Sequence, residues 1–152
     1  MLCFAEIQPE PIDTSRLEAA VEHPSCGAIL TFRGVVRDNF DGRSVSHLEY
    51  EAYAEMAVIV IREVVEGIDQ EWPGARVAVV HRVGSLALQE TSIAICVAAP
   101  HRDHAYKVSR ACIDRLKARL PVWKKEHFTE GEAEWRANRE FQGKTPTADG
   151  AD

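Results

Sequence analysis

The sequence predicts an α+β domain, in which helices pack on a mainly antiparallel sheet, from three features. Two long stretches, Glu55 to Trp72 and about Arg102 to Leu120, carry apolar residues at helical spacing. The segments around them are β-branched or alternate between apolar and polar residues, as strands do. Several of these segments are joined by hairpin-like connections, and 152 residues are enough to bury one core.

The N-terminal part predicts one short helix. Ser15 and Glu18 have the spacing of a capping box, in which each side chain satisfies a backbone N–H of the first turn. Leu17 and Val21 supply an apolar side, and Pro24 ends the element because proline cannot continue a helix.

Two strands are expected next. Cys26 to Arg37 is apolar and β-branched, which predicts a buried strand, and Gly34 within it suggests a bulge or a close backbone approach. A polar loop at 38–44 leads to Val45–Tyr53, where alternating residues predict a half-exposed strand.

The middle of the chain predicts a helix followed by two paired strands. Pro73 and Gly74 end the first long helix. Arg76 to Val83 and Thr91 to Ala99 then read as strands, joined by the segment GSLALQE.

The second long helix is followed by one more extended segment. Cys112 belongs to the apolar stripe of this helix, which favours a packing role for its thiol. Val122 to Phe128 is expected to be extended. Residues 1–141 are interpreted as a single domain, and the polar tail 142–152 is expected to be disordered.

Composition places the chain among ordinary cytosolic proteins. Hydrophobic residues make up 45% and charged residues 28%, and the N-terminus lacks the basic and apolar regions of a signal peptide. The longest apolar runs are far shorter than a membrane span. The four cysteines form no CxxC pair and no metal-ligand spacing, which favours a reduced, cytoplasmic setting.

Positive charge is concentrated in one part of an acidic chain. The net charge is −6, yet the segment from His101 to Lys125 holds eight Lys and Arg against two acidic residues. Such a local positive field inside a negative body indicates an anionic ligand bound at one place. It argues against general nucleic-acid binding, which a positive overall charge normally accompanies.

The stretch LPVWKKE, 120–126, contains the first candidate site. Neighbouring side chains of a strand point to opposite faces, so Lys124 and Lys125 cannot both face one pocket. Lys124 is the one expected to face inward, near Lys117 at the end of the preceding helix. The alternative is that basic residues here, including Arg115 and Arg119, complement the helix dipole and are solvated.

The segment AAPHRDH, 98–104, is a second candidate. A strand that ends directly before a helix presents free backbone N–H groups to an anion, and His101 and Arg102 would add charge and hydrogen bonds there. The alternative is that Asp103 caps the helix and His101 lies at the surface. A metal pair of His101 and His104 lacks a third convincing ligand.

A weaker signal lies in TFRGVVR, 31–37. Arg33 and Arg37 share one face if strand pairing continues unbroken, whereas a bulge at Gly34 would separate them. His81 and Arg82 form a similar but weaker signal. The sequence contains no phosphate-binding glycine loop and no recognisable Ser or Cys nucleophile motif, so an enzymatic nucleophile would arrive with the substrate or a partner.

Taken together, six motifs resemble the large, catalytic subunit of molybdopterin synthase. They occur in the order of that family and span about two-thirds of the chain. They are TFRGVVRD (31–38), LEYEAYAEMA (48–57), VVHRVGSL (79–86), APHRDHAY (99–106), IDRLKARLPVWKKE (113–126) and GEAEW (131–135).

The resemblance implies an α/β-hammerhead fold with an additional antiparallel β-subdomain, and a homodimer. Each subunit would bind one small ubiquitin-like sulfur-carrier subunit, which gives a heterotetramer. The C-terminal Gly-Gly thiocarboxylate of that carrier would enter the pocket and transfer sulfur to cyclic pyranopterin monophosphate, forming the dithiolene of molybdopterin. No cofactor and no metal are implied.

The resemblance also assigns residue roles. Lys117 and Lys124 would be catalytic, one in proton transfer and the other in binding, although either could take either role. The residues expected to bind substrate or the carrier tail are Phe32, Arg37, His101, Arg102 and, from the neighbouring subunit, Arg139. Gln89 departs from the family, which often has glycine there, and this puts the turn geometry in question.

Two other classes of function are compatible with parts of the sequence. A non-catalytic module could dock a ubiquitin-like tail or a nucleotide phosphate in the same basic pocket, and would need only an exposed groove. An RNA-binding protein would need a continuous basic surface with exposed aromatic residues, which the net charge disfavours.

Overall fold

The computed structural model describes residues 1–137 and confirms a mixed α+β fold. Arg139 and the tail 142–152 lie outside the described residues. None of the three helices within residues 1–137 is long and apolar enough to cross a membrane. The helices are α1 (Thr14–Val21), α2 (Ala54–Glu71) and α3 (Arg102–Arg119). The strands are β1 (Leu2–Gln8), β2 (Ala28–Val35), β3 (Asn39–Phe40), β4 (Arg43–Ala52), β5 (Arg76–Arg82), β6 (Gly84–Ala87), β7 (Thr91–Ala99), β8 (Val122–Phe128) and β9 (Glu134–Ala137).

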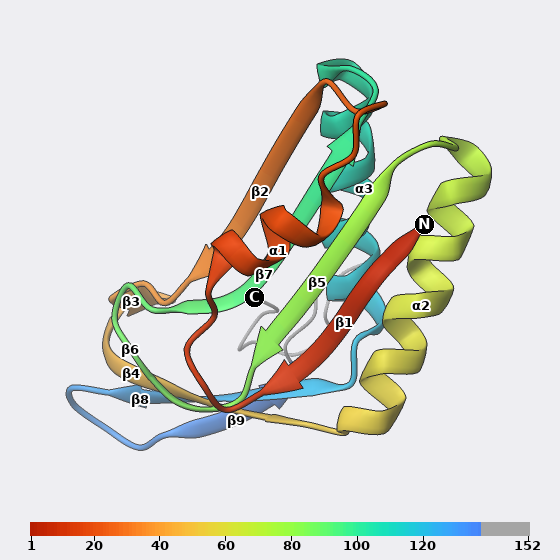
Figure 1. The fold of residues 1–152 in the computed structure, drawn as a ribbon. Helices are drawn as coiled ribbons and strands as arrows, with labels where there is room; N and C mark the ends of the chain where they lie inside the picture. The colour runs from red at the N-terminus through yellow and green to blue at the C-terminus, as the bar shows by residue number, and fades with distance from the viewer. Residues whose placement is uncertain (138–152) are drawn as a thin grey trace.

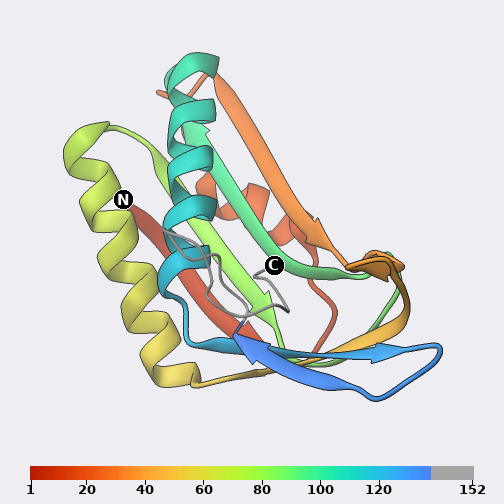
Figure 2. The same ribbon diagram turned by 180° about the vertical axis from the view of Figure 1, so that it is seen from behind.

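The first sheet has the strand order β1-β5-β7-β2 and is covered on both faces. Only the β1–β5 pair is parallel, and the β5–β7 and β7–β2 pairs are antiparallel. Helix α1 lies over one face in Figure 1, and α2 and α3 lie over the other face in Figure 2. Every residue of β7 after Thr91 is buried, because this central strand has helices on both sides.

Two apolar cores fill the layers on either side of this sheet. Leu17 and Val21 of α1 pack on small sheet residues such as Ala78 and Cys96. The larger core joins α2 and α3 to the opposite face and includes Cys112, which has no exposed surface. Burial raises the pKa of the Cys112 thiol to about 12, so this thiol packs and does not react, as the sequence predicted.

The second sheet has the order β3-β4-β8-β9, with β6 also paired to β4, and all of its pairs are antiparallel. It is the additional antiparallel β-subdomain that was expected. Figure 1 shows it below the first sheet, with β4 and β8 side by side. In the β4–β8 register Tyr50 lies opposite Lys124, which fixes the side of β8 that faces the interior.

Several elements differ from the prediction. The sequence did not indicate β1, β6 or β9, which are edge or short strands whose pairing depends on distant partners. The expected polar loop at 38–44 is also wrong, because it contains β3 and the first residues of β4. The helix cap was also placed wrongly: Asp13, and not Ser15, is the N-cap of α1. The Asp13 carboxylate accepts hydrogen bonds from the backbone N–H and the hydroxyl of Ser15, and these bonds lower the pKa of Asp13.

Of the two interpretations of Gly34, the bulge is confirmed. The register of β2 against β7 shifts between Gly34 and Val35, which is the bulge. A Cβ atom on Gly34 would lie 3.0 Å from a side-chain methyl carbon of Ile93, so the missing side chain leaves room for Ile93 and not for a neighbouring backbone.

The turn after β6 keeps a conformation that favours glycine. Gln89 has a φ of 71°, in the left-handed region. Its backbone N–H donates to the Val36 carbonyl, and the Glu90 carboxylate accepts from the Ala87 backbone N–H at 2.7 Å. The family's usual glycine therefore matches the geometry, and Gln89 adopts it at a cost in free energy.

Replacing Gln89 by glycine is expected to stabilise the protein. Gln89→Gly removes the left-handed strain but adds freedom to the unfolded chain, so the net gain in the free energy of unfolding should be about 0.5–1 kcal/mol. Chemical denaturation measures it. The neighbouring substitution Leu88→Gly, where φ is not positive, should destabilise, and equal effects of the two substitutions would contradict the strain at Gln89.

Candidate functional site

A cavity of about 230 Å³ lies where the two sheets meet the C-terminal end of α3. Its lining combines apolar side chains with several charged ones, which is the usual character of a ligand site. The charged and titratable residues in the lining are Arg37, His81, Lys117, Lys124 and Glu126. The apolar and aromatic ones include Phe32, Phe40, Leu48, Tyr50, Ile93, Ile113, Leu116 and Leu120.

Lys124 faces this cavity from β8, and its neighbour does not. Val122, Lys124 and Glu126 are buried in alternation with Trp123 and Lys125, so the strand presents Lys124 inward. Only 7% of Lys124 is exposed, and its Nζ lies 5.6 Å from the centroid of the Phe40 ring. The predicted orientation of the two adjacent lysines is confirmed.

Lys117 reaches the same cavity from the last turn of α3. The helix ends at Arg119 and β8 begins at Val122, so only Leu120 and Pro121 separate the two elements. Pro121 has no N–H to extend the helix, and its carbonyl accepts a hydrogen bond from Tyr53 at the end of β4. This short connection turns the chain between the two lysines and brings both to one cavity.

Arg136 belongs to the same group of charges, although the sequence did not single it out. It lies opposite Lys124 in the β8–β9 register, and its Nε is 2.9 Å from Glu126 Oε1. Its Cζ lies 4.3 Å from the centroid of the Phe40 ring. Strand alternation would have placed Glu126 inward beside Lys124, but the pairing of β9 that adds Arg136 has no signal in the local sequence.

Phe32 and Arg37 also line the cavity, as the family resemblance implied. Phe32 comes from β2, and Arg37 follows the bulge that ends this strand. Arg33 is exposed and is not in the lining, because the bulge removes the shared face that unbroken pairing would have given the two arginines.

His81 is a buried titratable residue in the cavity lining, where the sequence carried only a weak signal of a ligand site. Its Nδ1 lies 2.8 Å from the Arg82 carbonyl oxygen, which can only accept, so Nδ1 carries the proton and Nε2 is an acceptor in the neutral ring. Nε2 is buried and has no hydrogen-bond partner among residues 1–137. Burial is the main cause that lowers the pKa of His81 to about 4; Lys117 lowers it further, and the bond to Arg82 opposes the shift.

His101 and Arg102 lie at the other end of α3. They are exposed, and His101 is the N-cap without a side-chain capping bond. Asp103 does not cap the helix; it pairs with Lys107 at 3.0 Å. Lys117 lies fifteen positions after Arg102, which is about 22 Å along a helix, so one chain does not bring them to one cavity.

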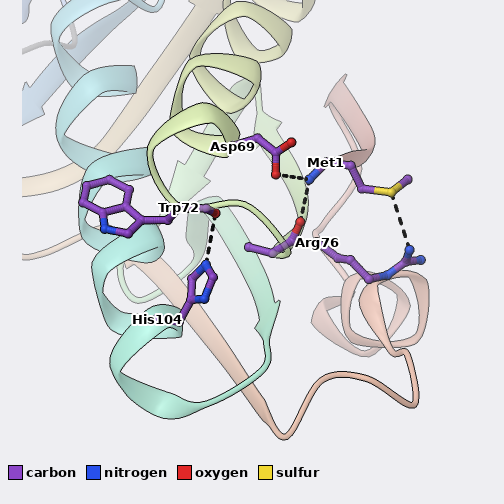
Figure 3. A network of polar contacts seen from close by, with 6 residues as sticks. Met1, Asp69, Trp72, Arg76 and His104 are labelled. Atoms are coloured by element: carbon purple, nitrogen blue, oxygen red, sulfur yellow. Dashed lines mark hydrogen bonds and ion pairs between the residues drawn. The ribbon is translucent and has the colours of Figure 1, made fainter.

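Two arginines and one histidine of α3 make contacts with α2 and its C-terminal end. Arg115 and Arg119 pair with Glu71 and Glu63 of α2 and are not in the cavity lining, so both have a structural role, although these ion pairs were not predicted. The ring of His104 lies 5.9 Å from that of His101, and its Nε2 is 3.0 Å from the Trp72 carbonyl oxygen (Figure 3). That contact ties the start of α3 to the end of α2.

The cavity is suited to binding anions and to promoting a reaction between them. Three cationic side chains, Arg37, Lys117 and Lys124, line it against one carboxylate, Glu126, which also pairs with Arg136. In a partly enclosed site such charges act with little screening by water. None of the four cysteines, all within residues 1–137, lines the cavity, so its lining offers no thiol as a nucleophile.

Comparison with known proteins gives a consistent result. The family described as "MoaE protein" matches residues 7–119. The molybdopterin synthase catalytic subunit 2 of Aedes aegypti is 40% identical over 140 residues, which cover 90% of each chain. A crystal structure of molybdopterin synthase from Staphylococcus aureus has a TM-score of 0.83 at 36% identity, covering 86% of this chain and 95% of the other. A complex of subunits 1 and 2 of the molybdopterin-converting factor from Helicobacter pylori shares the fold, with a TM-score of 0.68 at 17% identity over 93% and 95% of the two chains.

The neutral state of His81 should make stability fall in mild acid. The unfolded chain takes up a proton near pH 6.5, whereas the folded chain does so only near pH 4, so stability is complete above pH 6.5 and is lost as the pH falls toward 4. The loss from this residue should approach roughly 3 kcal/mol. Denaturant unfolding of the wild type and His81→Gln across this range measures it, and equal pH dependences would contradict the assignment.

Proposed function

This chain belongs to the MoaE family and has the function of a molybdopterin synthase catalytic subunit, and we propose that the cavity between its two sheets is where sulfur transfer takes place. The observation that carries the proposal is the convergence of Lys117 and Lys124, from consecutive elements, on that one cavity. The acceptor is cyclic pyranopterin monophosphate, and the product carries the dithiolene of molybdopterin. The donor is the C-terminal thiocarboxylate of a small ubiquitin-like carrier subunit.

The charges of the cavity support this chemistry. The pterin substrate bears a phosphate and the donor ends in a charged thiocarboxylate, so their approach brings two anions together. Repulsion between them raises the barrier unless cations lie between them, and preorganised charges are commonly the largest contribution to catalysis. Arg37, Lys117 and Lys124 supply those cations, and Phe32 lines the same space.

The two lysines have different roles, one in proton transfer and the other in binding. The attacking sulfur comes with the carrier, which agrees with the absence of a cysteine from the cavity lining. In our proposal Lys117 transfers the proton and Lys124 binds the carrier carboxyl or the substrate. Lys124 suits a binding role because β8 and the Phe40 ring hold it in a buried position.

His101 and Arg102 can serve this function in a homodimer, by contributing to the site of the second copy of the chain. The proposed assembly is a homodimer in which each subunit binds one carrier, and these two residues cannot reach their own cavity about 22 Å away along the helix. We therefore assign them to the substrate site of the partner subunit. The same assembly includes the predicted contribution of Arg139 from the neighbouring subunit.

The carrier partner and the cellular location each have one supporting observation. The Helicobacter pylori structure is a complex of two converting-factor subunits, which agrees with a carrier partner for a chain of this fold. The cytoplasm is the proposed location, and the four free cysteines agree with a reducing compartment.

Among other functions, a docking module remains the second candidate for the basic cavity. It would bind a ubiquitin-like tail without catalysis, so no dithiolene would form whether or not Lys117 is present. RNA binding is disfavoured by the net charge of −6.

Lys117→Ala and Lys124→Ala should each slow sulfur transfer by about 100-fold or more, because each removes a charge that stabilises the reaction. The measurement is a single-turnover assay of dithiolene formation with saturating thiocarboxylated carrier and pyranopterin substrate. Lys125→Ala is the matched control, since it removes an adjacent charge on the opposite face of β8, and its rate should change less than about threefold.

Unchanged transfer in both cavity variants would refute the site assignment. Binding of the carrier with no product from wild-type protein, across several cognate carriers, would favour the docking module instead.

Mixing two inactive variants tests the role of His101 and Arg102 in the second subunit. In a heterodimer of Arg102→Ala and Lys117→Ala, one of the two sites keeps both residues if the site is shared between subunits. Random subunit exchange should then restore about a quarter of wild-type activity, half of the dimers being mixed with one intact site each. If both residues served the same chain's site, mixing would restore none.

A further inference from the structure

Two histidines and a glutamate meet on the face of the second sheet that points away from the cavity. His47 and Glu49 lie on β4 between the inward-facing Leu48 and Tyr50, and His127 lies on β8 next to the buried Glu126. His47 is directly opposite His127 in the strand register. The three residues therefore share one face, although 80 positions separate the two histidines in the sequence.

Their ligand atoms are close together. One nitrogen of each imidazole and one oxygen of Glu49 all lie within 4.8 Å of one another. The two rings stack with centroids 4.1 Å apart and planes 10° from parallel. Ligand atoms around a tetrahedral zinc ion are about 3.4 Å apart, so small side-chain rotations would close the three around one ion.

The contact between His127 and Glu49 is short but poorly directed. His127 Nε2 lies 2.7 Å from Glu49 Oε1, yet this nitrogen is buried and forms no hydrogen bond of acceptable geometry with residues 1–137. The oxygen is therefore displaced from the direction in which the ring nitrogen bonds.

We propose that His47, Glu49 and His127 form a binding site for a divalent transition-metal ion, with zinc as the reference ion. Two imidazoles and one carboxylate are a ligand set typical of zinc sites that leave a further position for water.

One nearby cation, Lys125, opposes metal binding, and its charge is held away from the site. Lys125 lies opposite Glu49 in the register, on the same outer face. Its Nζ is 5.6 Å from the centroid of the Trp135 ring, which holds the charge over β9. Lys125→Ala should therefore tighten metal binding, because it removes a positive charge beside the site.

The site would connect the two strands that frame the cavity. A metal held by His47 and Glu49 of β4 and by His127 of β8 cross-links the pair that positions Lys124. The ion would lie outside the cavity and take no part in sulfur transfer, so this inference stands apart from the proposed function. Its expected effect is on the stability of the second sheet.

Isothermal titration of the metal-free, full-length protein with ZnCl₂ tests the site. We expect one ion per chain, and a rise in Tm of at least about 5 °C when free zinc is a hundredfold above Kd. Substitution by Co²⁺ should give a visible spectrum of nitrogen and oxygen ligation without a thiolate charge-transfer band, which separates this site from binding by Cys3 or Cys26.

Three variants and two controls complete the test. His47→Ala, His127→Ala and Glu49→Gln should each weaken binding at least tenfold, and the conservative glutamine keeps the test valid if an alanine variant fails to fold. His23→Ala, at an exposed histidine bonded to Ser25, and Cys26→Ser should bind as the wild type does. The proposal would be overturned if the wild type bound no zinc, or if the substitutions of His47, Glu49 and His127 left binding unchanged. His127 and Glu49 would then form an ordinary ion pair.

Discussion

The pairing of β4 with β8 in a single register is the constraint on which the cavity depends. Tyr50 lies opposite Lys124, and this register turns Lys124 toward the interior and Lys125 away from it. A slip of one residue would exchange the two lysines and would also turn Val122 and Glu126 to the other face. The apolar core beneath the sheet therefore selects the register, and the register selects the lysine that the cavity receives.

Keeping Lys124 buried has an energetic cost that its surroundings reduce. A cation removed from water is unfavourable unless charges or polar groups compensate it. Lys124 shares its face with Glu126, and Glu126 also pairs with Arg136 beside the same aromatic ring of Phe40. The cluster keeps an excess of positive charge that is already in place before an anion arrives, which is the arrangement that electrostatic catalysis requires.

Local sequence patterns predicted much of this arrangement, because they depend on near neighbours. Strand alternation showed that only one of Lys124 and Lys125 can face a given pocket, and the family resemblance favoured Lys124. Pro121 marked the turn that brings it near Lys117. The same reasoning did not find Arg136 or β9, since their positions depend on a pairing between segments that carry no signal of each other. His101 and Arg102 show a different limit: the sequence marked them as an anion site but could not show that α3 holds them far from the cavity of their own chain.

Competitive labelling of lysine side chains tests the central claim, that one cavity holds Lys117 and Lys124 and excludes Lys125. The protein would be treated with a lysine-modifying reagent with and without saturating cyclic pyranopterin monophosphate, and modification at each lysine would be quantified by peptide mass spectrometry. The substrate should protect Lys117 and Lys124 and leave the modification of Lys125 and the exposed Lys107 unchanged. Protection of Lys125 in place of Lys124, or equal labelling of all four lysines in both conditions, would contradict the central claim.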